Sequence, residues 1–199
     1  MHDYSMRGHP RERLIYFLAA AAFSIMPLIT TLSGWLGVGL AATNFTLFGL
    51  LFVAFDRFIW RWWPVRRILG LPDLNGKWNC EGQQYDENGN AGRSWEGTIT
   101  IVQTWSRLCV ATKTETSRSR SGPASIEKDE GHGFRLLYTY QNDPMPGQPN
   151  LTPHRGTCEL VFDEDCTQAT GIYFNDHHRR SFGRLTLTRS QENQKEQPE

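Results

Sequence analysis

Charge is missing from one long stretch of this chain. No Asp, Glu, Lys, Arg or His occurs from Leu14 to Phe55, although charged residues make up 21% of the 199 residues. A helix needs about 20 apolar residues to cross the roughly 30 Å hydrocarbon layer of a bilayer. The uncharged run is long enough for two such helices, so it indicates a segment that belongs in lipid.

The chain also lacks an excess of either charge. It has 21 basic and 21 acidic residues and a formal net charge of zero. The whole-protein charge therefore gives no argument for binding a nucleic-acid polymer.

Motifs for catalysis and metal binding are absent as well. The sequence has no nucleophile elbow, no P-loop and no His-Glu-x-x-His motif, so we expect no enzyme, no catalytic residue and no cofactor. Asp176–His178 has the composition of a metal site, but adjacent histidines on an extended chain point in opposite directions, and no metal is predicted. Cys80, Cys109, Cys158 and Cys166 show no C-x-x-C spacing. We expect reduced cysteines, although a Cys158–Cys166 disulfide stays open from sequence.

The uncharged run contains its own break. Leu14–Leu32 and Leu36–Phe55 are the two predicted spans, and Ser33–Trp35 is the short turn between them. A signal peptide followed by one anchor is the alternative, but the first apolar run is long for a signal and no convincing cleavage site follows. The sequence favours a helical hairpin over residues 14–63.

Arginines lie before and after the hairpin but not in the turn between its two spans. Three precede the first span and four follow the second, whereas the turn has none: Arg7, Arg11, Arg13, Arg57, Arg61, Arg66 and Arg67. The positive-inside rule places residues 1–13 and the C-terminal part in the cytoplasm. Asp56–Arg67 interleaves Trp and Arg, as expected for a collar at the membrane interface. Gly37, Gly39, Ala41 and Ala42 form a smooth helix face, which serves oligomerisation, a polar pore lining or only the contact within the hairpin.

From Lys77 onward the apolar period changes from helical to two. The predicted strands are Trp78–Gln84, Trp95–Gln103, Leu108–Thr116, Ala124–Lys128, Phe134–Asn142, His154–Asp163, Gly171–Asn175 and Phe182–Arg189. Turn signals, among them Gly122-Pro123, separate them. About eight short strands in series predict an all-β domain over residues 73–190, built as an antiparallel up-and-down barrel, with a two-sheet sandwich as the alternative. Residues 191–199 are predicted to be a disordered tail.

Alternation along these strands predicts which side chains share the inner face. Each inner face runs from apolar to polar, and the polar ends are Gln103, Thr114, Thr116, Tyr140, Asn142 and His154. We expect these ends to meet at one mouth, above a core that fills the other half of the barrel. Tyr and Trp rings stack on flat molecules, and Arg107, Arg118 and Arg120 are candidates for binding phosphate.

The architecture resembles a known family. Two membrane helices, an Arg/Trp collar and a barrel that opens with Leu74–Trp78 are similar to the CBASS antiphage membrane effectors, the CD-NTase-associated proteins with a transmembrane pair and a lipocalin-like barrel. Further matching stretches are Gln103–Trp105, Thr114–Ser119, Tyr138–Asn142, His154–Thr157 and Gly171–Phe174. The similarity rests on their order, because no one stretch is specific.

The resemblance implies a function. A partner nucleotidyltransferase makes a cyclic oligonucleotide, the barrel binds it, the chain forms homo-oligomers, and the helices disrupt the lipid bilayer of the bacterial inner membrane. The predicted ligand-binding residues are Trp105, Arg118, Tyr138, Tyr140, Asn142 and His154. Two rivals remain: a membrane-tethered carrier or sensor of a lipid, which requires an apolar cavity, and a structural protein whose packed barrel has no cavity.

Overall fold

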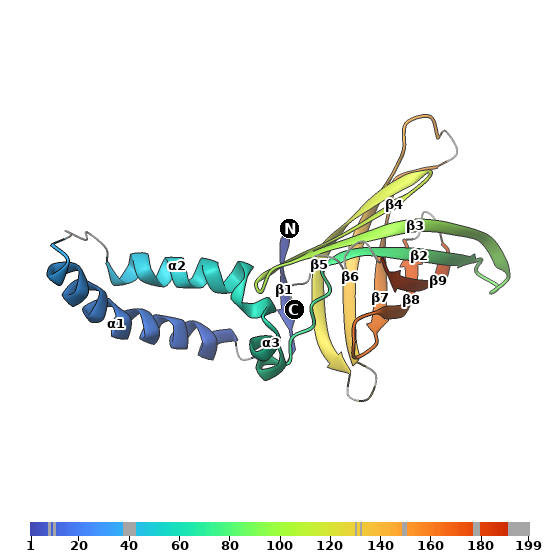
Figure 1. Cartoon of the computed structure of the whole chain (residues 1–199). Coiled ribbons are helices and arrows are strands. Elements are labelled where there is room, and N and C mark those ends of the chain that lie inside the picture. Colours follow the sequence, from blue (N-terminus) through green and yellow to red (C-terminus); the bar gives the residue numbers. More distant parts are fainter. Residues whose placement is uncertain are drawn as a thin grey trace. The chain divides into compact units, whose positions relative to one another are not determined.

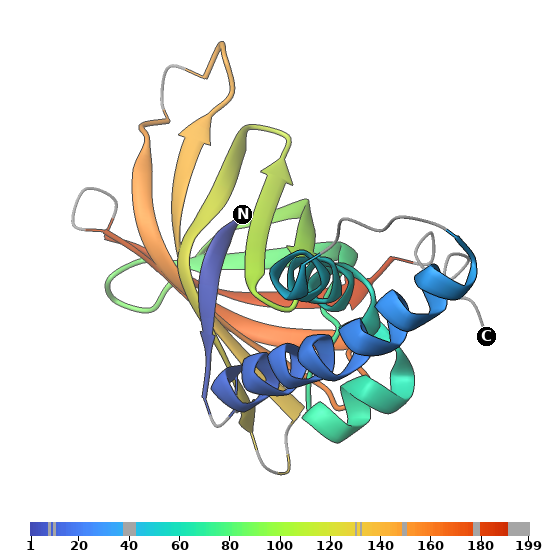
Figure 2. The ribbon, with the colours of Figure 1, turned by 90° about the vertical axis from the view of Figure 1, so that its left-hand side faces the viewer.

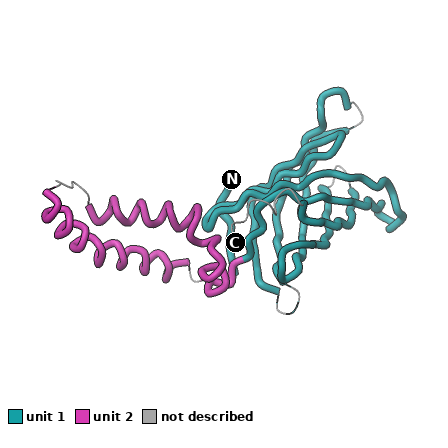
Figure 3. The backbone as a smooth tube through the Cα atoms, viewed as in Figure 1, with its two compact units in different colours: residues 1–7, 72–199 teal, residues 8–71 magenta. Residues whose placement is uncertain are grey.

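The computed structural model describes residues 1–7, 9, 11–37, 43–129, 131, 133–148, 151–176 and 180–190 (Figure 1). The chain divides into two compact units, Met1–Arg7 with Pro72–Glu199 and Gly8–Leu71, which Figure 3 colours separately. The predicted tail 191–199 lies outside the described residues, as do His177 and His178.

The first unit is mostly β-sheet, as predicted. Its strands are β1 His2–Met6, β2 Gly76–Tyr85, β3 Ala91–Gln103, β4 Arg107–Thr114, β5 Ser117–Asp129, β6 Gly133–Pro144, β7 His154–Phe162, β8 Gln168–Asn175 and β9 Phe182–Arg189. From β2 to β9 each strand pairs antiparallel with the next, and β9 returns to pair with β2. These pairings form a closed barrel, which we call the barrel unit.

Strand β1 is the main departure from the prediction, which treated residues 1–13 as a separate N-terminal segment. It lies between β4 and β5 and pairs antiparallel with β4 at His2↔Leu108 and parallel with β5 from Tyr4↔Ala124 to Met6↔Ile126. Figure 2 shows it as the dark blue strand. The strand is too short to show a clear period of two, but it buries Tyr4 to 3% exposure and therefore belongs to the barrel.

Strand β5 is longer than predicted, because Gly122-Pro123 is not a turn. The strand begins at Ser117, and its register with β6 shifts between Ser121 and Ala124. Proline lacks the N–H that a strand ladder needs, and a bulge accommodates it without ending the strand. The true turn between β4 and β5 is at Glu115 and Thr116.

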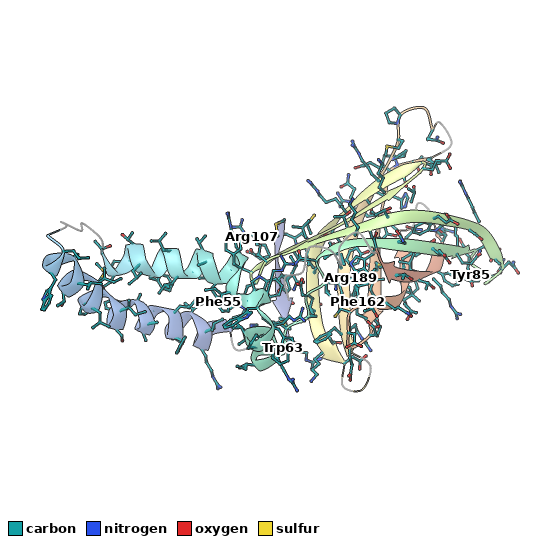
Figure 4. All side chains as sticks on the ribbon, viewed as in Figure 1. Phe55, Trp63, Tyr85, Arg107, Phe162 and Arg189 are labelled. Atoms are coloured by element: carbon teal, nitrogen blue, oxygen red, sulfur yellow. The ribbon has the colours of Figure 1, made fainter. Side chains whose placement is uncertain are left out.

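The apolar core fills one half of the barrel unit. Trp78 is fully buried, its ring meets that of Phe162 at 5.1 Å, and its indole Nε1 donates to the Leu74 carbonyl at 3.1 Å. The guanidinium of Arg189 lies over this indole, 5.3 Å from the ring centroid, and Figure 4 labels Arg189 and Phe162 close together. The Gly76–Trp78 pair that opens the barrel therefore supplies a core anchor.

The second unit is helical, with α1 Arg11–Trp35, α2 Asn44–Arg57, a short 3₁₀ turn η1 Ile59–Arg61 and α3 Trp63–Leu69. Among the described residues, α1 alone is long and apolar enough to cross a membrane. The predicted second span is not obtained: α2 has 14 residues, which reach about 21 Å at 1.5 Å each. Thr43 caps α2 by accepting from the Thr46 N–H, so the helix starts later than the hydropathy indicated.

Polar groups of α1 bond within the helix itself. Thr30 and Thr31 donate their hydroxyls to the Pro27 carbonyl at 2.9 and 2.8 Å. Gly37 lies beyond the end of α1, so it is not on a helix face as predicted, and Gly39, Ala41 and Ala42 lie outside the described residues. In the predicted collar, Arg67 stacks over Trp63 at 5.4 Å.

Candidate functional site

A cavity of about 810 Å³ occupies the half of the barrel unit that the core leaves open. It is lined by inward-facing residues of β2 to β9, at the end where β4 turns into β5. The charged side chains in its lining are all exposed: Glu81, Arg93, Glu96, Glu115 and Arg184. The buried side chains of the lining are therefore aromatic, apolar or neutral polar groups.

Aromatic rings form one wall of this cavity. Trp95 of β3 and Tyr173 of β8 meet edge to face, and the indole Nε1 donates to the Tyr173 hydroxyl at 3.3 Å. Tyr138 and Tyr140 follow each other on the inner face of β6, and Tyr140 donates its hydroxyl to Asn175 Oδ1 at 2.8 Å. Each ring that carries a polar atom thus has a partner that fixes its orientation.

Hydroxyl groups form the facing part of the lining, on β4 and β5. Thr112 and Ser119 are direct cross-strand partners, and both line the cavity. Thr114 holds the turn between the strands, because its hydroxyl oxygen accepts from the Ser117 N–H at 3.0 Å. The cavity therefore offers a stacking surface on one side and hydrogen-bonding groups on the other.

His154 and Asn142 lie opposite each other at the start of β7 and near the end of β6. His154 is 8% exposed, and its Nδ1 lies 3.1 Å from the Thr152 carbonyl oxygen. Since a carbonyl only accepts, Nδ1 carries a proton and donates this bond. This pair supplies one imidazole and one amide to the polar part of the cavity.

The structure brings together four of the six predicted binding residues. Tyr138, Tyr140, Asn142 and His154 all line the cavity. Trp105 does not: it is buried in the turn between β3 and β4, at the core end of the barrel. Arg118 does not either, because its neighbours Ser117 and Ser119 face inward and its own side chain is exposed.

Further corrections concern residues that were assigned to the mouth. Gln103 is 4% exposed and pairs with Leu108, whereas Thr114 pairs with Gly97 at the other end of the same ladder. Arg107, which Figure 4 labels, begins β4 and also lies at the core end. Its Nε is 3.7 Å from Asp3 Oδ1. Arg120 lines a separate groove outside the cavity.

Trp95, Tyr173 and Asn175 also line the cavity, although they were not among the predicted binding residues. Trp95 shares the parity of Ile99 and Ile101, and Tyr173 lies within one of the stretches that carry the family resemblance. Both signals were available in the sequence. What the sequence did not show is that β3 and β8 place these two side chains in contact.

All four cysteines are free and buried, so the alternative of a Cys158–Cys166 disulfide is wrong. Burial away from water raises the pKa of Cys80 and of Cys158 from 9.0 to about 12, because it disfavours the thiolate. The same effect raises the pKa of the Tyr138 phenol, which hydrogen-bonds to Cys158.

We predict that a thiol reagent at pH 8 reacts slowly with the folded chain and rapidly with all four cysteines in denaturant. The pKa of Cys80 and of Cys158 is higher in the folded chain than in the unfolded chain. These two thiols therefore contribute fully to the free energy of unfolding below pH 9, and their contribution falls as the pH rises towards about 12. Thiol titration and denaturant melts between pH 8 and 11 measure both effects. Fewer than four reactive thiols in denaturant without reductant would contradict the free-cysteine assignment.

A closed β-barrel whose core fills one half and whose other half holds an aromatic cavity has the architecture of barrels that bind small molecules. Residues 69–189 match the family described as Cap15, cyclic dinucleotide receptor domain. The chain belongs to this family.

Two relatives carry the name CD-NTase-associated protein 15. The protein from Yersinia aleksiciae is 41% identical over 139 residues, which cover 70% of this chain and 65% of that protein. The protein from Staphylococcus schleiferi is 26% identical over 143 residues, 71% of this chain and 74% of that protein. The match thus spans just under two thirds of the Yersinia protein. Both relatives support the resemblance to a CBASS effector.

Proposed function

We propose that this chain is a CBASS effector whose barrel cavity binds a cyclic oligonucleotide made by a partner nucleotidyltransferase. Ligand binding drives homo-oligomerisation, and the helical unit then disrupts the bacterial inner membrane. The observation that carries the proposal is the cavity itself, since it lies within the residues that match a cyclic dinucleotide receptor domain.

The chemistry of the cavity suits a nucleotide. Its volume of about 810 Å³ falls within the range of roughly 300–1,000 Å³ for small-molecule sites. Stacking of a base on an aromatic side chain contributes about 1–3 kcal/mol per base. Tyr140, Trp95 and Tyr173 supply such surfaces, and Asn142 with His154 supplies the donors and acceptors that read a base edge.

The same lining disfavours the two rival functions. A lipid carrier requires an apolar cavity, but hydroxyls and amides line this one from β4 through β8. A purely structural barrel would have no cavity of this size. Neither rival gains support from a specific feature of the described residues.

The helical unit supports action on a membrane. Only 17% of the most apolar window of α1 is buried, whereas a core helix of a soluble protein is mostly buried. Large apolar side chains are exposed along both helices: Tyr16, Phe17, Phe23, Leu28 and Leu32 on α1, and Phe45, Leu50 and Val53 on α2. Water disfavours such a surface and lipid favours it.

The path of the chain also bears on topology. Strand β1 precedes α1 and strand β2 follows α3, yet both belong to the barrel unit. If α1 crosses a bilayer, the segment from 36 to 57 must bring the chain back to the same side. Arginines precede α1 and follow α2, which favours a cytoplasmic location for that side, where a cytosolic nucleotide is accessible.

We predict that a cyclic oligonucleotide raises the melting temperature of the full-length chain in detergent. A ligand at 100 times its dissociation constant stabilises a folded protein by about 2.7 kcal/mol. The panel should contain cyclic di- and trinucleotides, their linear forms as matched controls, and a long-chain fatty acid. A shift with one cyclic compound and none with its linear form is the expected result. A shift with the fatty acid alone would overturn the nucleotide assignment in favour of the lipid carrier.

A further inference from the structure

Three of the cavity rings share one packing arrangement, in which the residue directly across the strand ladder is glycine. Trp95 pairs with Gly82, Tyr140 with Gly156, and Tyr173 with Gly183. The three pairs lie on three different ladders of the barrel: β2–β3, β6–β7 and β8–β9.

Each ring occupies the space that a side chain on its partner would fill. A Cβ at residue 82 would lie 2.2 Å from the Trp95 indole, and one at residue 156 would lie 2.4 Å from the Tyr140 hydroxyl. A Cβ at residue 183 would likewise lie 2.4 Å from the Tyr173 ring. The rings therefore lie over the backbone of the neighbouring strand and along the wall of the barrel.

This arrangement affects the shape of the cavity. The interior of a barrel of about eight strands is narrow enough for side chains to fill it. An aromatic side chain that pointed straight into the lumen would therefore occupy the cavity. A glycine in a strand interior weakens the strand and marks a place where another group approaches closely. Here the approaching group is a ring of the barrel itself, so the packing of the ring on the glycine backbone offsets part of that cost and leaves the cavity open with a flat aromatic lining.

We propose that Gly82, Gly156 and Gly183 are positioning residues for ligand binding, because they hold Trp95, Tyr140 and Tyr173 against the wall as stacking surfaces for the flat rings of the ligand. The inference rests on the proposed function, since it assigns the bases of the cyclic oligonucleotide to this wall. The glycines act through the rings and do not themselves need to contact the ligand.

Gly82→Ala is the sharpest test, because all three atoms nearest to the added Cβ belong to the Trp95 side chain. At Gly156 and Gly183 the added Cβ would also meet backbone oxygen atoms, at 2.4 and 2.5 Å. In Gly82→Ala the indole must swing away from the wall into the cavity. We expect the affinity of the full-length chain for the cyclic dinucleotide that stabilises it to fall at least about tenfold, the scale of one lost stacking contact.

Gly92→Ala is the matched control. It changes a glycine on the same pair of strands, but its Cβ would meet its nearest atom at 3.4 Å, an ordinary contact. Titration calorimetry should give wild-type affinity for this variant. Equal affinity of Gly82→Ala and wild type would overturn the glycine role and leave the proposed function standing. A wild-type chain that binds no cyclic nucleotide would instead overturn the proposed function.

A double variant separates the ring from the backbone. If Gly82 acts through Trp95, adding Gly82→Ala to Trp95→Ala should cause no further loss of affinity, because the clash is gone. Should Gly82→Ala alone fail to fold, the double variant should fold again. A double variant that binds more weakly than Trp95→Ala, or that still fails to fold, would overturn the inference.

Discussion

Deletion of residues 1–7 is expected to lower the free energy of unfolding of the barrel unit by at least about 4 kcal/mol. The loss of one buried aromatic side chain costs about 3–5 kcal/mol, and the deletion removes Tyr4, which is 3% exposed. It also removes the strand between β4 and β5, which leaves Leu108 and Ile126 beside open strand edges. Exposed edges of this kind pair with other chains, so we also expect aggregation.

Urea unfolding of the full-length and deleted chains in the same detergent measures the effect. Ser5→Ala is the matched control, because Ser5 lies on the same strand with an exposed side chain and should change stability little. Tyr4→Ala should by itself cause most of the same loss of stability, although it leaves the chain at full length. An unchanged midpoint after the deletion would show that β1 does not pair with the barrel in solution. A fragment that begins at residue 73 lacks β1 and is expected to be unstable for the same reason.

The sequence predicted the eight strands from β2 to β9 because alternation and turn residues are local signals. It missed β1 because five residues with one buried side chain show no periodicity that stands out. It placed the start of the second span eight residues before the start of α2 for a similar reason. Hydropathy measures the length of an apolar run, whereas the start of α2 depends on the cap at Thr43.

The errors in the candidate site have a different origin. Alternation shows which face a side chain lies on, but not its position along the barrel axis. Gln103 and Trp105 were therefore assigned to the polar mouth, although they lie at the core end. Only the register shows that Gln103 pairs with Leu108 at the core end. The glycine–ring pairs need the register too, because Gly156 and Tyr140 lie on different strands and no spacing connects them.

The buried side chain of Gln103 connects β1 to the residues that precede β2. Its side-chain Nε2 donates to the Tyr4 hydroxyl at 3.3 Å and to the Pro72 carbonyl at 3.2 Å, and its Oε1 accepts from the Leu74 N–H at 3.0 Å. Tyr4 lies just before the helical unit in the chain, and Pro72 follows directly after it. One side chain therefore links strand β1 to the residue at which the chain re-enters the barrel unit.

Replacement of residues 8–71 by a short Gly/Ser linker is therefore expected to give a soluble barrel that keeps β1 and keeps its ligand. Because Tyr4, three residues before Arg7, and Pro72 bond to one side chain, a flexible linker can join Arg7 to Pro72. The same variant should lose all ligand-dependent membrane damage, since it lacks the exposed apolar helices. Calorimetry with the activating nucleotide and dye release from lipid vesicles measure the two properties separately.

The full-length chain with Trp95→Ala is the complementary variant, because it keeps the helices and loses a stacking surface. It should associate with vesicles but release dye only at higher nucleotide concentrations. Dye release by the linker variant would show that the barrel itself damages the membrane. That result would contradict the proposal that the helices cause the damage. Loss of nucleotide binding in a linker variant that still melts cooperatively would show that the helical segment contributes to the site. If the linker variant binds and only the helix-bearing chain releases dye, recognition lies in the barrel and membrane damage in the helices.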